Sequence, residues 1–362
     1  MSSDLFIGLM TGTSVDGIDA VLARIDDDHF SLLESHSHTL PADLTDDILT
    51  LCQPGDGELD AAGKVSRQLG RIYAEACAAL LKKAGMDASQ ITAIGCHGQT
   101  VRHRPGADGF SVQLGCPDTL ACASGIPVVN NFRNKDMVLG GQGAPLVPPF
   151  HRRLFAATGE RRAIVNIGGM ANATLLDGDT LVGGFDTGPG NVLMDLWIQL
   201  HSGDSYDADG AWAASGKINK PLLNRLLRDP YFQQPPPKST GREHFNRQWL
   251  TRHLKDELPA ENLQATLAEL TARSITDSLT DFAPQRLLIC GGGAHNGHLI
   301  ERLRACSGVP VVSTDSEGLH PDWVEAAAFA WLAWARWNEQ PGNAPVVTGA
   351  SREAILGQVT LP

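Results

Sequence analysis

Close to the amino terminus the chain reads Ile7-Gly8-Leu9-Met10-Thr11-Gly12-Thr13-Ser14-Val15-Asp16-Gly17-Ile18-Asp19. Apolar residues precede the polar middle of this stretch, and an alternating apolar pattern follows it as far as Ile25. The pattern predicts a strand, a tight polar turn and a second strand, which together form a β-hairpin. Glycines in such a turn let a ligand approach the backbone amides, and the hydroxyl side chains add further donors for an anion. The same pattern also fits an ordinary polar hairpin that binds nothing.

Two carboxylates in the turn indicate which kind of anion would bind there. Asp16 and Asp19 would repel a naked phosphate, but they suit a magnesium–phosphate complex, either directly or through water. The sequence shows no set of His, Cys and carboxylate residues with the spacing of a transition-metal site. Mg²⁺ that travels with a nucleotide is therefore the only metal that we expect.

Glycine turns after apolar runs recur in the second half of the chain. Gly168-Gly169 follows an apolar run at residues 163–167 and precedes another at 173–176. Gly291-Gly292-Gly293 follows the apolar run at 286–290 and precedes a helical pattern. This recurrence predicts two related α/β lobes that hold one nucleotide between them.

Length, charge and cysteine usage exclude several classes of protein. The 362 residues are enough for two lobes, and the net charge of −12 argues against a nucleic-acid or anionic-membrane surface. The chain has no run of 18 apolar residues, and Met1-Ser2-Ser3-Asp4 does not resemble a signal peptide, so we expect a soluble, cytoplasmic protein. The seven cysteines never form C-x-x-C and are expected in the core rather than in disulfides or metal sites.

The order of the predicted elements divides the chain into two lobes. Residues 1–133 and about 320–362 are expected to form the first lobe, and residues 134–319 the second. Near residues 206–245 the composition shifts to polar residues and a proline run, which predicts an insertion with one short helix at the rim of the cleft. Strands are predicted at 29–40, 91–96, 111–114, 126–129, 181–185, 286–290 and 309–312, and helices at 43–52, 59–84, 118–124, 151–157, 192–200, 220–227, 263–281, 294–303 and 324–337.

Asp186 is the strongest candidate for the reacting group. It lies in Gly183-Gly184-Phe185-Asp186-Thr187-Gly188-Pro189-Gly190-Asn191, where a predicted strand ends and a helix begins. A carboxylate at that position is expected to project into the cleft and to take a proton from water or from a sugar hydroxyl. The alternative role is a helix cap or an Asx turn, which aspartate fills routinely.

Two further groups follow predicted strands of the first lobe. Arg133 is suited to grip a carboxylate, and the turn His97-Gly98-Gln99-Thr100 is suited to hydrogen-bond sugar hydroxyls. The alternatives are a surface ion pair for Arg133 and an ordinary turn histidine for His97.

Taken together, these motifs resemble those of the anhydro-N-acetylmuramic acid kinases. The resemblance covers nearly the whole chain and is weakest at 206–245. Its motifs are Gly8-Leu9-Met10-Thr11-Gly12-Thr13-Ser14-Val15-Asp16-Gly17-Ile18-Asp19, His97-Gly98-Gln99-Thr100, Asn131-Phe132-Arg133, Gly140-Gly141-Gln142-Gly143-Ala144-Pro145-Leu146-Val147-Pro148, Asn166-Ile167-Gly168-Gly169-Met170-Ala171-Asn172, Phe185-Asp186-Thr187-Gly188-Pro189-Gly190-Asn191 and Cys290-Gly291-Gly292-Gly293-Ala294-His295-Asn296.

The resemblance implies a fold and a reaction. The fold is the two-lobe, actin-like ATPase (ribonuclease H-like) fold of the sugar kinases, actin and heat-shock ATPases, with the nucleotide cleft between the lobes. The reaction is the coupled hydrolysis and ATP-dependent phosphorylation of 1,6-anhydro-N-acetylmuramic acid, a cell-wall recycling sugar. The products are N-acetylmuramic acid 6-phosphate and ADP, and the family suggests a homodimer.

The resemblance also assigns roles to residues. It makes Asp186 the base that activates water against the anomeric carbon. It places His97, Thr100, Arg133 and Glu325 at the sugar, with Arg133 on the lactyl carboxylate. ATP and Mg²⁺ are assigned to Gly12, Thr13, Ser14, Val15, Asp16, Gly17, Ile18 and Asp19, and the nucleotide further to Gly168, Gly169, Asn172, Gly291, Gly292 and Gly293.

Two other functions fit the sequence less completely. A kinase of the same superfamily that acts on an ordinary sugar or carboxylate would need Asp186 and a hydroxyl, but no water. A non-catalytic, actin-like ATP switch would respond to a protein partner rather than to a sugar.

Overall fold

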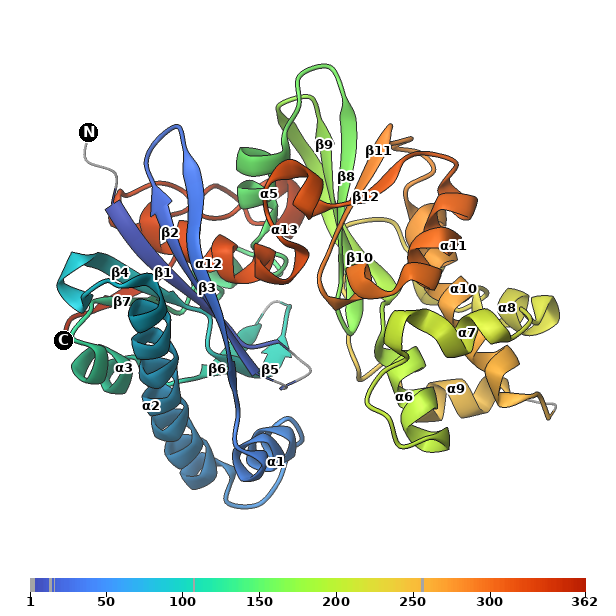
Figure 1. Ribbon diagram of the computed structural model, residues 1–362, viewed down its shortest axis with the longest axis horizontal. Helices are drawn as coiled ribbons and strands as arrows, with labels where there is room; N and C mark the ends of the chain where they lie inside the picture. The colour runs from blue at the N-terminus through green and yellow to red at the C-terminus, as the bar shows by residue number, and fades with distance from the viewer. Residues whose placement is uncertain (1–3, 13–14, 16, 107, 255–256) are drawn as a thin grey trace. The chain divides into compact units, whose positions relative to one another are not determined.

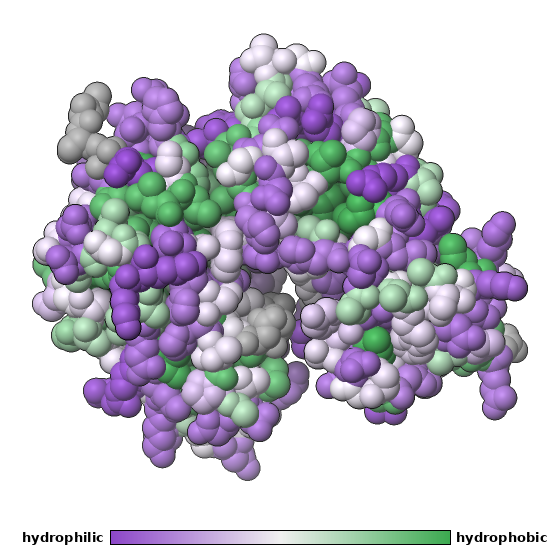
Figure 2. Space-filling view, in the orientation of Figure 1, coloured by the Kyte–Doolittle hydropathy of each residue, from purple (hydrophilic) through white to green (hydrophobic). Residues whose placement is uncertain are grey.

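The structure is a computed structural model that describes residues 4–12, 15, 17–106, 108–254 and 257–362. The chain forms two compact units, Met1–Phe150 with Trp323–Pro362 and His151–Asp322. Residues 134–150 thus group with the first unit, whereas the sequence pattern predicts that they belong to the second lobe. The face drawn in Figure 2 is largely hydrophilic, with smaller hydrophobic areas. Among the described helices, none combines the length and the apolar character needed to cross a membrane.

A mixed sheet forms the centre of the first unit (Figure 1). Its strand order is β13-β7-β4-β1-β2-β3. These strands are β1 (Asp4–Met10), β2 (Gly17–Ile25), β3 (Phe30–Thr39), β4 (Ile91–Cys96), β7 (Val128–Asn130) and β13 (Gln358–Thr360). β1 and β2 are antiparallel with Met10 opposite Asp19, which confirms the predicted hairpin. β4 runs parallel to β1, so both deliver their carboxyl ends to the same edge of the sheet.

Helices pack on both faces of this sheet. Ile7 and Leu9 of β1 belong to the same core cluster as Leu69 and Tyr73 of α2. Side chains alternate along a strand, so Gly8 lies on the other face, against α12. The helices of this unit are α1 (Ala42–Leu51), α2 (Glu58–Ala84), α3 (Pro117–Ser124), α4 (Asn134–Val138), α12 (Val324–Trp337) and α13 (Pro345–Thr348), and a separate hairpin is formed by β5 (Gln99–Arg104) and β6 (Phe110–Leu114).

The second unit repeats the plan with the strand order β10-β9-β8-β11-β12. β8, β11 and β12 are parallel, and β9 is antiparallel to both β8 and β10. The strands are β8 (Arg161–Ile167), β9 (Met170–Asp177), β10 (Thr180–Pro189), β11 (Arg286–Cys290) and β12 (Val311–Ser313). The helices are α6 (Val192–His201), α7 (Ala211–Ser215), α8 (Lys220–Leu226), α9 (Arg247–His253), α10 (Ala260–Ser278) and α11 (Gly297–Ser307), and α5 (Pro148–Phe155) lies at the junction of the units in the sequence.

Most predicted elements are confirmed, with a difference after β11. The sequence predicted a helix from residue 294, directly after the glycines. A 3₁₀ turn, Gly292–His295, comes first, and α11 begins only at Gly297. Asn296 caps α11, because its side chain accepts a hydrogen bond from the Leu299 amide at 2.9 Å.

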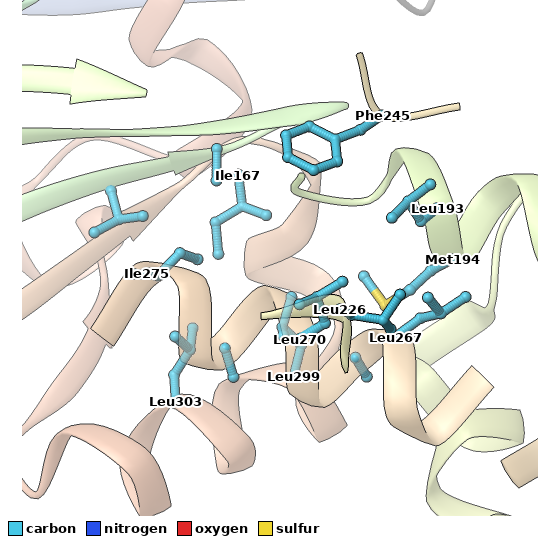
Figure 3. Packing of buried hydrophobic residues seen from close by; sticks show 14 of the residues in the cluster. Ile167, Leu193, Met194, Leu226, Phe245, Leu267, Leu270, Ile275, Leu299 and Leu303 are labelled. Carbon is cyan, nitrogen blue, oxygen red and sulfur yellow. The ribbon is translucent and has the colours of Figure 1, made fainter. Parts of the chain in front are cut away.

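The segment 206–245 is more than an insertion with one helix. The predicted helix forms as α8, but α7 and two 3₁₀ turns, Ala208–Gly210 and Pro230–Gln233, form as well. Leu226 and Phe245 are fully buried and lie in one cluster with Leu193 and Met194 of α6 (Figure 3). The polar composition concealed this because a few apolar residues, spaced for helices, are enough to anchor the segment in the core.

Candidate active site

The loop between β1 and β2 is described only in part. The candidate residues Thr13, Ser14 and Asp16 lie outside the described residues. The Gly12 carbonyl accepts a hydrogen bond from the Val15 amide at 3.2 Å. Val15 and Ile18 are buried in the core, so any contact that they make with a nucleotide would come from the backbone.

The Asp19 side chain is held on the sheet by a hydroxyl. Ser37 of β3 donates a hydrogen bond to Asp19 Oδ1 at 2.7 Å. Oxygen ligands of this kind fit Mg²⁺, which prefers carboxylates and water. Within the described part of the chain, no group of three or more His, Cys, Asp or Glu residues is arranged to hold a metal ion.

Strand register in the second unit places three polar side chains in a row. Asn172 of β9 lies opposite Asn166 of β8 and also opposite Asp186 of β10. Directly opposed residues share a face, and the alternating neighbours Ile167 and Phe185 point into the core on the other side. The row Asn166, Asn172 and Asp186 thus lies at the carboxyl end of β8, on the face that does not carry this core.

The Gly168-Gly169 turn is bound to the start of α6. The amide of Asn191 donates to the Gly168 carbonyl at 2.8 Å, and that of Gly190 to the Gly169 carbonyl at 2.9 Å. A side chain at Gly190 would overlap the Gly168 carbonyl oxygen, so only glycine fits there. The β8–β9 turn and the end of β10 therefore form one continuous backbone surface beside Asp186.

The triple glycine packs against the end of β8. Gly291 has φ +74°, and a Cβ there would overlap Asn166 Oδ1; a Cβ at Gly293 would overlap the Ile167 side chain. At Gly292, in contrast, the nearest atom that the described residues place within 4 Å of the Cβ position is Asn191 Nδ2, at 3.9 Å. Asn166 Oδ1 is buried and has no hydrogen-bond partner among the described residues. A buried acceptor without a partner is costly, which favours a ligand donor or a water at this point.

Asp186 is fixed by a segment that the sequence did not assign to the site. The Thr240 amide donates to Asp186 Oδ2 at 3.0 Å, the Asp186 amide donates to the Lys238 carbonyl at 3.1 Å, and the Tyr231 hydroxyl donates to the Asp186 carbonyl at 2.6 Å. The carboxylate is thereby oriented through both its backbone and its side chain.

In the first unit, His97 and Arg133 are in direct contact. Arg133 donates from Nε at 3.1 Å and from Nη2 at 2.7 Å to His97 Nε2, and from Nη1 to the Gly143 carbonyl at 2.8 Å. Arginine has no acceptor, so Nε2 must be unprotonated and the ring proton lies on Nδ1. Burial, followed by the Arg133 charge, holds the pKa of His97 well below its usual range. His97 is therefore a neutral residue that orients the guanidinium.

The buried carboxylate of Asp136 holds Gly143, the second hydrogen-bond partner of Arg133, in place. Asp136 is fully buried and accepts hydrogen bonds from the Gly143 amide at 2.8 Å, from Asn343 Nδ2 at 2.8 Å and from the Thr348 hydroxyl at 2.7 Å. A side chain at Gly141 would overlap Asp136 Oδ2. Residues 141–143 are thus fixed around Asp136, and with them the carbonyl that binds Arg133.

The remaining sugar candidates occupy separate positions in the same unit. Thr100 lies in β5, and its hydroxyl accepts a hydrogen bond from Gln113 Nε2 at 3.1 Å. Glu325 is partly buried in the first turn of α12. Of the four sugar candidates, His97 and Arg133 contact one another directly.

Comparisons with known proteins agree with these motifs. A family model described as anhydro-N-acetylmuramic acid kinase matches residues 4–362. The chain belongs to the anhydro-N-acetylmuramic acid kinase family. The anhydro-N-acetylmuramic acid kinase of Saccharophagus degradans is 51% identical over 371 residues, which cover 100% of both chains. That of Shewanella halifaxensis is 50% identical and covers 99% of this chain and 98% of its own. The chain is therefore an enzyme of a kinase family, and that family acts with ATP in cell-wall recycling.

Solved structures support the fold of this kinase family member. Component A of the (R)-2-hydroxyglutaryl-CoA dehydratase of Acidaminococcus fermentans matches with a TM-score of 0.50 over 91% of this chain and 96% of that chain. The sequence identity is 9%, so this likeness concerns the fold alone. It confirms the predicted α/β, actin-like ATPase fold.

Sequence reasoning missed residues in each unit, Lys238 and Tyr231 in the second and Asp136 in the first. Lys238 and Tyr231 lie in the segment expected at a rim, and Asp136 follows Arg133 closely but was given no role. The run Lys238-Ser239-Thr240-Gly241-Arg242 was a usable signal, because small and basic residues after three prolines are typical of a loop that binds something.

Proposed function

We propose that this enzyme opens 1,6-anhydro-N-acetylmuramic acid with water and phosphorylates its 6-oxygen with ATP, giving N-acetylmuramic acid 6-phosphate and ADP. The observation that carries the proposal is the Asp186 carboxylate, which is oriented by Thr240 and stands in one row with Asn172 and Asn166. Membership in the family supplies the sugar and the phosphoryl donor.

Asp186 would act as the general base. Its carboxylate takes a proton from water while the water oxygen bonds to the anomeric carbon. The bond between that carbon and the bridging 6-oxygen breaks, and its electron pair stays on the 6-oxygen. This oxygen attacks the γ-phosphorus of ATP, and the bond to the ADP oxygen breaks. General-base catalysis of this kind contributes about a hundredfold to ten-thousandfold in rate.

The other candidates would bind and orient the substrates. Arg133, set by His97 and the Gly143 carbonyl, would face the lactyl carboxylate, and Thr100 and Glu325 would contact sugar hydroxyls. The Nε–Nη2 edge of Arg133 already engages His97, so a carboxylate would meet the guanidinium at its other edge.

The phosphates would lie at the glycine turns. Residues 12–19, Gly168, Gly169, Asn172 and residues 291–293 would line the nucleotide. Mg²⁺, where bound, neutralises phosphate charge, and Asp16 and Asp19 would hold it directly or through water.

The first experiment measures ADP release with Mg·ATP and a panel that contains the anhydro sugar and N-acetylmuramic acid. In ¹⁸O-labelled water, we expect product that carries label at the anomeric oxygen and none in the phosphate group. Phosphorylation of N-acetylmuramic acid in place of the anhydro sugar would indicate an ordinary sugar kinase. A rate of ADP release that no sugar changes but that a protein partner increases would indicate an ATP switch. Sedimentation analysis of the same preparation tests the homodimer that we also propose.

A further inference from the structure

Lys238 is buried at a position where lysine is uncommon. Its side chain is 9% exposed, and lysine is seldom buried without a charged partner. Its ammonium donates one long hydrogen bond, to the Tyr231 carbonyl at 3.4 Å, and lies 4.8 Å from the centre of the Tyr231 ring. An ammonium group has three donors, and among the described residues this is its one hydrogen bond.

The segment that carries Lys238 is bound to Asp186 on both sides. The Lys238 carbonyl accepts from the Asp186 amide, and two residues later the Thr240 amide donates to the Asp186 carboxylate. The Tyr231 hydroxyl binds the Asp186 carbonyl. Residues 231–240 therefore form a strap along β10 that cannot move without releasing Asp186.

The strap is itself anchored in the second unit. Asp229 accepts hydrogen bonds from the Tyr231 amide at 2.9 Å and from Trp249 Nε1 at 2.7 Å, and His244 Nε2 lies 3.2 Å from its carboxylate. These contacts, together with buried Phe245, fix the position of Tyr231. They thereby fix the carbonyl and the ring that the Lys238 ammonium contacts.

Lys238 and Tyr231 each interact electrostatically with Asp186. Burial and the Asp186 charge raise the pKa of Tyr231, so the phenol stays neutral and acts only as a donor. Burial lowers the pKa of Lys238, while the Asp186 charge opposes that effect. Beyond them, Asp229 and His244 face Tyr231. Lys238 is thus the positive charge on the strap that acts on the Asp186 carboxylate.

We propose that Lys238 is a positioning residue of the reaction, whose buried ammonium keeps the Asp186 carboxylate ionised while the strap orients it. This inference rests on the proposed function, since it assigns the ionised form of Asp186 a role as base. A nearby positive charge favours a carboxylate over its protonated form and extends the pH range in which the base is active.

The experiment compares the pH dependence of kcat/KM for the anhydro sugar in four forms. Lys238→Met keeps the length and apolar stem of the side chain but removes the charge, and Lys238→Arg keeps the charge. Lys217→Met, at an exposed position of the same unit, is the matched control. We expect the acid limb of the profile to move up by about one pH unit or more in Lys238→Met, and to stay in place in the other two variants.

A direct titration separates this inference from the proposed function. The Asp186 carboxyl, assigned in ¹³C spectra by its loss in Asp186→Asn, should titrate at a higher pH in Lys238→Met even if no sugar is turned over. If Lys238→Met does not fold, Lys238→Gln replaces it. An unchanged Asp186 titration in a folded neutral variant, with only a lower Tm, would overturn the inference and leave Lys238 a packing residue.

Discussion

Arg133 donates two hydrogen bonds to the same ring nitrogen of His97, from Nε at 3.1 Å and from Nη2 at 2.7 Å. The two residues are 36 positions apart in the sequence and come from the ends of β4 and β7, which are neighbours in the sheet. This geometry requires a neutral His97 with its proton on Nδ1. The histidine therefore acts as an acceptor that orients the arginine rather than as an acid or a base.

We predict that His97→Leu weakens use of the sugar selectively. Hydrogen bonds to a charged group contribute roughly 1.5–3 kcal/mol, so kcat/KM for the anhydro sugar should fall about tenfold to a hundredfold. The KM for ATP should stay nearly unchanged. Steady-state kinetics with each substrate varied in turn measures both effects.

A second substitution at the same position provides the control. His97→Gln retains an oxygen that can accept from Arg133 and should recover part of the loss. Equal losses in both variants, accompanied by a lower Tm, would assign His97 to packing alone.

Asp186→Asn is predicted to abolish turnover while ATP binding stays nearly intact. The amide keeps an oxygen for the Thr240 amide but cannot take a proton from water. Rate and nucleotide affinity are measured on the same preparation, by ADP release and calorimetric titration. Activity within tenfold of wild type would rule out Asp186 as the base.

The triple glycine allows packing and ligand binding to be separated. Gly293→Ala would overlap the Ile167 side chain and should lower the free energy of unfolding by about 1–3 kcal/mol. Gly292→Ala has room for its methyl group and should leave the Tm nearly unchanged while raising the KM for ATP several-fold. Thermal unfolding and ATP kinetics distinguish the two, and an unaltered ATP KM in Gly292→Ala would remove residue 292 from the nucleotide site.

Gly8 and Gly95 are predicted to be essential for packing α12 onto the first sheet. They are opposite one another in the parallel β1–β4 pair, and a Cβ on either would overlap a backbone carbonyl of α12, that of Ala326 or of Phe329. Gly95→Ala should therefore destabilise the protein by about 1–3 kcal/mol or prevent folding.

A matched control lies in a helix of the same unit. Gly63 is an exposed residue inside α2 with no described atom within 4 Å of its Cβ position. Gly63→Ala should stabilise the protein by about 0.5–1 kcal/mol, since alanine loses less backbone entropy in a helix. Denaturant unfolding measures the stability of both variants. If Gly63→Ala were also destabilising, the space around the added methyl group would not explain the effect of Gly95→Ala.

Buried His151 is predicted to make stability depend on pH. Burial lowers its pKa from about 6.5 to about 3, so the unfolded chain binds the proton more readily between these values. The contribution of His151 to the free energy of unfolding is therefore fully present above pH 6.5. It decreases as the pH falls, by about 2 kcal/mol at pH 5.

The contribution of His151 is isolated by comparing two proteins. His151→Gln can still hydrogen-bond Thr174, the partner of Nδ1 at 2.8 Å, but does not titrate. The loss of unfolding free energy between pH 8 and pH 5 should be smaller in this variant than in wild type by that amount. An equal loss in both would show that His151 does not carry the effect.

Much of the local structure followed from the sequence. Apolar runs ending at glycine turns predicted the β1–β2 and β8–β9 hairpins, and period-3.6 patterns predicted α2, α10 and α12. These signals are local, because strand and helix periods depend on neighbours only a few residues apart. The family resemblance added functional roles for Asp186 and for the turns around it.

The segment 206–245 shows where local signals end. Its prolines and charges predicted a peripheral insertion, yet Leu226 and Phe245 complete the core. Lys238 is buried as well, and its carbonyl accepts a hydrogen bond from the Asp186 amide. No period in the sequence indicates a contact between residues that lie 50 positions apart. Only a folded core brings them together.

The sequence by itself determined which residues can do chemistry, because the side-chain types and the glycine turns are local properties of the chain. The tertiary structure decided which of them act together. Strand register aligns Asn166, Asn172 and Asp186, and sheet order brings His97 to Arg133. Register and order result from burying whole faces of sheets and helices, so they depend on the entire unit rather than on any one stretch of sequence.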